Sequence, residues 1–65
     1  MKTYNVSVKN IYTNDERSIT LSCNQAEDVR IIHKDAMKSI SMEEDITSIK
    51  TDDKTVYSIN KGFIG

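Results

Sequence analysis

Polar and apolar residues alternate along residues 3–12, and this period of two predicts a β-strand. A second alternating stretch, with serine and threonine between the apolar positions, covers residues 18–23. The segment Thr13–Glu16 between them favours a turn, because Asn and Asp side chains bond their own backbone and tolerate left-handed conformations. We therefore predict a first hairpin over residues 1–23. Its apolar positions are Tyr4, Val6, Val8, Tyr12, Ile19, Leu21 and Cys23.

The apolar spacing changes to the helical period over Gln25–Ile40, which predicts an amphipathic helix within residues 24–41. Asn24 is suited to cap its N-terminus, and Glu27 completes an Asn-x-x-Glu variant of the capping box. One helical face spanning about 140° carries the apolar residues and should face the core. Its members are Ala26, Val29, Ile32, His33, Ala36, Met37 and Ile40.

A second hairpin is predicted over residues 45–60, with Thr51–Lys54 as its turn. We expect Thr47, Ile49 and Thr51 to share one face of its first strand, and Thr55, Tyr57 and Ile59 one face of its second. Ile46 falls out of this register and should fill the corner between helix and strand. The tail, residues 61–65, either frays or pairs onto the sheet, and the pattern leaves both open.

Together these segments predict one small α+β domain over residues 1–65, with a ββαββ order. The four-stranded sheet would be mainly antiparallel, with the helix packed across one face and a face rich in Ser, Thr and Asn in water. Strand order stays open, because either hairpin could lie at the centre. We expect a core of Val6, Val8, Ile19, Leu21, Val29, Ile32, Ala36, Ile40, Ile49, Tyr57 and Ile59.

Composition narrows the functional classes. The 65 residues are 37% apolar and 29% charged with a net charge of −1, which fits a folded chain. The positive charge is too low for sequence-independent binding of nucleic acid by the monomer. No apolar run approaches the ~18 residues of a membrane span, so we expect a cytoplasmic protein without membrane contact. Abundant Lys, Asn and Ile favour an AT-rich genome and a bacterial or viral (phage) accessory protein.

Catalytic and metal chemistry find little support in the sequence. Cys23 and His33 would lie about 14 Å apart along a helix axis, whereas a general base must come within about 3 Å of its proton. With one cysteine and one histidine, no disulfide and no Cys/His metal cluster can form within the chain. The acidic residues 43–45 and 52–53 lack the spacing of a calcium loop. We therefore predict no enzyme, no cofactor and no metal, and a homodimer as one means of reinforcing so small a core.

Two groups of apolar side chains are expected to be exposed instead of packed in the core. Ile31 points into the charged helix face, and an apolar pair ends the tail. The candidate contact residues for a protein partner are Ile31, Lys34, Asp35, Lys38, Phe63 and Ile64. An open edge strand is a further contact.

The sequence thus predicts a non-enzymatic protein-interaction module, such as an adaptor, inhibitor or accessory factor that occupies a partner's surface. The partner is another protein, a second copy of the chain, or both. The alternative is a small dimeric nucleic-acid-associated regulator, in which two helices pair Arg30, Lys34 and Lys38 against phosphate.

Overall fold

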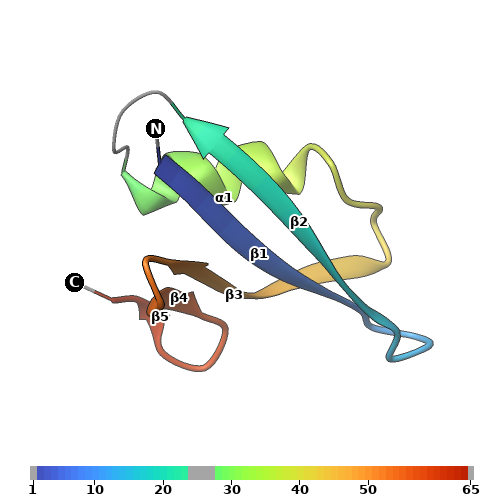
Figure 1. Cartoon of the computed structure of the whole chain (residues 1–65). Helices are drawn as coiled ribbons and strands as arrows, with labels where there is room; N and C mark the ends of the chain where they lie inside the picture. The colour runs from blue at the N-terminus through green and yellow to red at the C-terminus, as the bar shows by residue number, and fades with distance from the viewer. Residues whose placement is uncertain (1, 24–27, 65) are drawn as a thin grey trace.

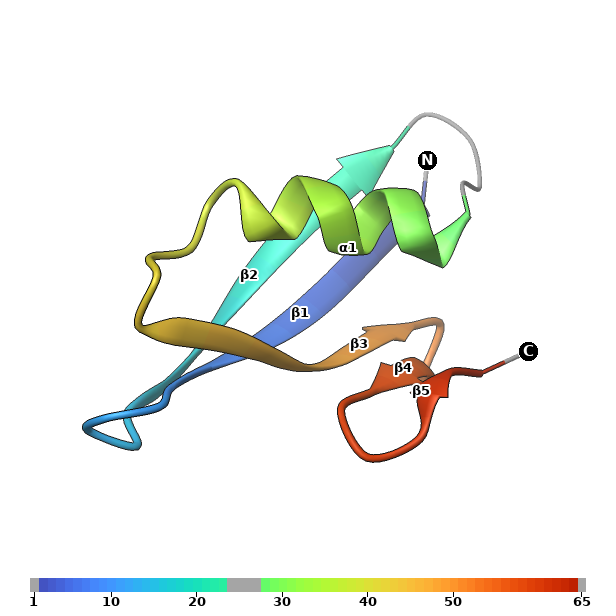
Figure 2. The same ribbon diagram turned by 180° about the vertical axis from the view of Figure 1, so that it is seen from behind.

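The computed structural model of the chain describes residues 2–23 and 28–64. Its elements are β1 (Lys2–Asn10), β2 (Glu16–Cys23), α1 (Val29–Met37), β3 (Glu44–Thr51), β4 (Lys54–Ser58) and β5 (Gly62–Phe63). The strands form one antiparallel sheet in the order β2-β1-β3-β4-β5, and α1 lies across one face of it (Figures 1 and 2). The predicted α+β class is confirmed. The described residues contain five strands instead of four, because part of the tail pairs with β4.

The first hairpin has the predicted pairing and turn chemistry. Its register runs without interruption from Lys2 opposite Cys23 to Lys9 opposite Glu16. The turn is closed by Asn10, whose Oδ1 accepts the backbone N–H groups of the second and third residues after it at 2.9 and 3.0 Å. Asn14 takes the left-handed conformation, with φ 65°. Tyr12 was predicted as an apolar position of the first strand, but β1 ends at Asn10 and Tyr12 lies exposed in the loop.

A β-bulge in β3 places Ile46 in the core. Val6 lies opposite Ile49, but Val8 lies opposite Ile46, so β3 contains one extra residue between these pairs. Thr47 occupies this position, and its hydroxyl donates to the Ser7 carbonyl at 3.2 Å. The prediction that Thr47 shares the face of Ile49 is wrong. Ile46, expected to fill the corner between helix and strand, lies within β3 and is fully buried in the core. The bulge lets two isoleucines three residues apart both point toward α1.

A second irregularity in β4 changes the faces of the last predicted strand. Ile49 lies opposite Tyr57, whereas Lys50 lies opposite Thr55, so Val56 is the extra residue. Thr55 is therefore exposed while Tyr57 packs against the core. Ile59 was expected in the core, but β4 ends before it and its side chain is 49% exposed. That prediction failed because the strand is shorter than the alternating pattern.

The helix begins later and ends earlier than predicted. Asp28 has extended backbone (φ −61°, ψ 133°) and caps α1 by accepting the Arg30 N–H at 2.9 Å. The helix therefore begins at Val29. The predicted cap at Asn24 and Glu27 falls outside the described residues. At the other end Met37, expected on the core face, is exposed. The segment is one short helix of nine residues.

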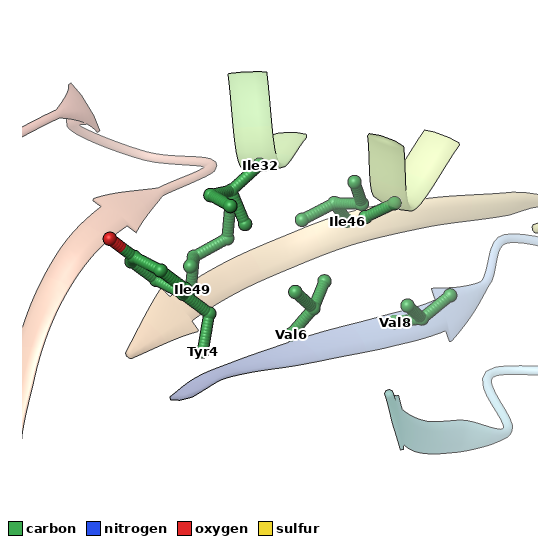
Figure 3. Close-up of a cluster of buried hydrophobic side chains, with 7 residues drawn as sticks. Tyr4, Val6, Val8, Ile32, Ile46 and Ile49 are labelled. Carbon is green, nitrogen blue, oxygen red and sulfur yellow. The ribbon is translucent and has the colours of Figure 1, made fainter. Parts of the chain in front are cut away.

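The core lies between α1 and the helix-facing side of β1 and β3 (Figure 3). Most of the expected core positions are buried there or pack against the buried cluster. The buried side chains are Tyr4, Val6, Val8, Ile32, Ala36, Ile46 and Ile49. Half-buried side chains around them are Ile19, Leu21, Cys23, Val29, Ile40, Val56 and Tyr57. No helix of the described chain covers the other face of the sheet (Figure 1). The polar residues Asn5, Ser18 and Thr20 of the first hairpin are exposed.

Candidate protein-contact surface

The tail folds back onto the sheet and lies beside the N-terminal half of α1. Gly62 makes this turn possible, because its φ of 77° is a conformation that L side chains rarely adopt. Beyond it Phe63 pairs with Tyr57, and the Ile64 N–H donates to the Val56 carbonyl at 2.9 Å. These main-chain bonds give the apolar end of the described chain a defined position.

Aromatic contacts join this end of the sheet to α1. The His33 ring meets the Tyr57 ring edge-on, with centroids 4.8 Å apart, and lies 5.7 Å from Phe63. Tyr57 and Phe63 are themselves 4.9 Å apart. The Arg30 guanidinium lies over the Phe63 ring, 5.7 Å from its centroid, within the range of a cation–π contact. Phe63 is thus held from several sides.

These contacts form a shallow hollow at the surface. Its lining residues, which we call the α1–β5 patch, are Asp28, Val29, Arg30, Phe63 and Ile64. Phe63 is 45% exposed and Ile64 41% exposed, although both are fixed by backbone pairing. The lining combines the apolar side chains of Val29, Phe63 and Ile64 with the charged Asp28 and Arg30. Aromatic residues and arginine are enriched at protein–protein contacts.

The structure separates the two predicted groups of contact residues. At 3.6 residues per turn, Ile31 lies about 160° around α1 from His33, which faces β4 and β5. Ile31, Asp35 and Lys38 therefore share the other side of the helix, where all three are exposed. Lys34 lies about 40° around the helix from Arg30 and is exposed. Phe63 and Ile64 are brought together, and Ile31 is not part of their surface.

Arg30 and His33 were not among the predicted protein-contact residues, and Arg30 was named only for the nucleic-acid alternative. Their spacing of three residues places them on neighbouring helix positions. Their proximity to Phe63 depends on β5 pairing with β4, which the sequence pattern left open. The apolar residues of the tail, Phe63 and Ile64, were visible in the sequence, but the surface against which they pack was not.

An ion pair anchors the segment between α1 and β3 to the edge of the sheet. Arg17 of β2 binds the Glu44 carboxylate through two nitrogens, at 2.7 and 2.8 Å. Glu44 also accepts the Ser41 N–H at 3.0 Å. The hydrogen bonds from Arg17 and Ser41 lower the pKa of Glu44 from 4.5 to about 2. This carboxylate is thus charged at neutral pH and structurally engaged.

Asp52 and Asp45 also have local structural contacts. Asp52, at the β3–β4 turn, pairs with Lys2, and this hydrogen bond lowers the pKa of its carboxyl. The Asp45 carboxylate accepts the N–H of the next residue, Ile46, at 2.9 Å. Within residues 2–23 and 28–64, no three His, Cys, Asp or Glu side chains converge as a metal site would require. The helix of the described chain is too short and too polar to cross a membrane.

A scan against protein-family models and searches of curated proteins and of solved structures found no match.

Proposed function

We propose that the chain is a non-enzymatic protein-interaction module, an adaptor, inhibitor or accessory factor that acts by occupying a partner protein's surface. The observation that carries this proposal is the α1–β5 patch, where Phe63 and Ile64 are ordered by main-chain bonds yet remain near half exposed. Apolar groups held in place before binding lose little conformational entropy on association. Docking through this patch would therefore cost little conformational entropy.

The chemistry of the patch also suggests what it binds. Aromatic residues and arginine are the side chains most enriched among the energetically dominant residues of interfaces. Phe63 offers an apolar anchor, and the Arg30 guanidinium above it offers donors for a carboxylate. The partner that fits is a protein with an apolar recess bordered by acidic residues.

The test is affinity capture by the tagged chain from a lysate of its source or host cell, with the same capture by point variants. Ile64→Ala and Ile59→Ala form a matched pair, because both remove an isoleucine of similar exposure, 41% and 49%. We expect one protein recovered near equal stoichiometry by the wild type and by Ile59→Ala, and recovery reduced by Ile64→Ala and Phe63→Ala. Equal recovery by all of these variants would remove the patch from the proposal.

The helix face around Ile31 is a separate contact in the same proposal. Ile31 is half exposed, so Ile31→Asp should weaken capture with little change in thermal stability. Loss of folding in this variant would contradict its exposed position. If recovery instead disappears with nuclease and falls steeply with salt, binding occurs through phosphates and the regulator alternative replaces the module.

A further inference from the structure

β2 forms a long open edge of the sheet. It lies at the end of the strand order, and no described strand pairs with its outer side. It is eight residues long, whereas β5 at the opposite edge has two. Ser18, Thr20 and Ser22 are exposed along it. An edge of this length is a template for another strand.

The middle of β2 also lacks the features that keep edge strands apart. Natural edges are protected by charge, proline or bulges. The charges of β2 are confined to Glu16 and Arg17 at its start, and Arg17 is held by Glu44. Residues 18–23 contain no charge, no proline and no glycine, and their pairing with β1 has no bulge.

The hairpin register shows which backbone groups of β2 point outward. Opposite residues in an antiparallel pair alternate between bonded and non-bonded pairs. The Asn10 N–H donates to the Asp15 carbonyl at 2.8 Å, so this pair belongs to the bonded set. Counting along the register, Asn5 and Thr20 fall in the non-bonded set. The backbone N–H and C=O of Thr20, and likewise of Ser18 and Ser22, therefore point away from β1.

The sequence of this edge is symmetric about Thr20. Residues 18–22 read Ser-Ile-Thr-Leu-Ser. If a second copy pairs antiparallel about a two-fold axis at Thr20, each residue lies opposite a residue of the same or similar type. Ser18 lies opposite Ser22 of the copy, Ile19 opposite Leu21, and Thr20 opposite Thr20. The three outward-pointing residues all fall in bonded pairs in this register, and each such pair exchanges two hydrogen bonds.

We infer that β2 pairs with β2 of a second copy of this chain, antiparallel and centred on Thr20. The half-buried Ile19 and Leu21 extend the apolar face across the junction, while the hydroxyl residues pair on the open face. No like charges meet, because Arg17 lies opposite Cys23 and Glu16 lies beyond it. The two sheets become one continuous sheet, which removes the exposed edge. This surface is independent of the α1–β5 patch at the other end of the strand order.

Proline at position 20 tests the dimer. The Thr20 N–H points outward, so Thr20→Pro removes a donor used between copies and none used between β1 and β2. We expect sedimentation equilibrium to show a dimer for the wild type and for Thr20→Val, and a dissociation constant raised about tenfold or more for Thr20→Pro. Circular dichroism is the control that checks whether each variant is folded. A wild type that stays monomeric at hundreds of micromolar, or a dimer unaffected by Thr20→Pro, overturns the inference.

Cysteine crosslinking tests the register without proline. In a Cys23→Ser background, Thr20→Cys places two thiols opposite each other, with Cα atoms about 5.5 Å apart, within disulfide range. Ser22→Cys is the matched control, because its thiols would lie about four residues, or roughly 14 Å, apart along the strands. We expect fast covalent dimer formation under mild oxidation for Thr20→Cys only. Equal or faster crosslinking of Ser22→Cys overturns the register.

Discussion

The most informative stability test compares Ile46, which the sequence pattern placed outside the strand register, with Ile59, which it placed in the core. Ile46 is fully buried because β3 bulges at Thr47, whereas Ile59 follows the end of β4 and is 49% exposed. Without the bulge, Ile46 and Ile49 would point to opposite faces, because side chains alternate along a strand. Ile46→Val and Ile59→Val each remove the same methylene, so their difference reports on the register.

The expected magnitudes follow from burial. Ile→Val at a fully buried position costs about 0.5–1.5 kcal/mol, the sum of lost transfer free energy and of the small cavity that remains. In a domain of this size 1 kcal/mol lowers Tm by about 4–8 °C. Ile46→Val should therefore lower Tm by several degrees. Ile59→Val should change the free energy of unfolding by less than about 0.5 kcal/mol.

The assay is urea unfolding followed by far-ultraviolet circular dichroism, with both variants and the wild type at one protein concentration. The concentration is fixed because self-association would stabilise the folded state. We expect a lower midpoint for Ile46→Val with an unchanged m-value, and an unchanged midpoint for Ile59→Val. A larger loss from Ile59→Val than from Ile46→Val would show that the bulged register is wrong.

Three further predictions concern charge and turns. Glu44 has a pKa of about 2 in the folded state against 4.5 ordinarily, so its contribution to stability is complete above about pH 5 and is lost as pH falls toward 2. Glu44→Gln should therefore lower Tm at pH 7 and flatten its fall with acid, whereas the exposed Glu43→Gln should leave that profile unchanged. Asp53 sits at φ 61° in the β3–β4 turn. In denaturant titrations the free energy of unfolding should therefore rise by about 0.5 kcal/mol for Asp53→Gly and fall by about 1 kcal/mol for Asp53→Ala. Asn10→Ala leaves two loop N–H groups without their side-chain acceptor and should cost about 1 kcal/mol in the same titration.

Local patterns predicted the elements well where one signal dominated. The alternation of Val6 and Val8 with polar residues, and the turn residues Asn14, Asp52 and Asp53, sufficed for both hairpins. These signals act over a few residues, and the positive φ values are ones that Asn and Asp tolerate. The class of the fold followed from them.

The same patterns failed where two local solutions had similar energies. Asp28 caps a helix as well as Asn24 does, so sequence alone could not decide between two starting points four residues apart. The sequence pattern likewise did not predict the bulge at Thr47, although the three-residue spacing of Ile46 and Ile49 indicated it. Two large aliphatic residues three apart in a strand can share a buried face only if an extra residue lies between them. Packing against α1, a long-range effect, favours that arrangement.

The candidate surface depended still more on long-range pairing. Phe63 and Ile64 stood out as apolar residues in a polar tail, but their position beside Arg30 requires β5 to pair with β4. Similarly, the exposed edge at β2 exists only because β1 pairs with β3, which puts the first hairpin at one end of the sheet. Neither strand pairing has a local sequence signal. The sequence could therefore indicate which residues are candidates for contact, but not which residues lie beside them in the fold.

The strand order links the two proposals in a way that can be measured. The β2 edge and the α1–β5 patch lie at opposite ends of one sheet, so a dimer through Thr20 carries two patches, both far from the junction. We expect such a dimer to bind a densely immobilised partner through both patches and to dissociate slowly, because the second contact becomes intramolecular. Thr20→Pro should then dissociate faster than the wild type from a dense partner surface and at the same rate from a sparse one. Equal rates at every density, with the wild type dimeric in solution, would show that the two patches cannot engage one surface together.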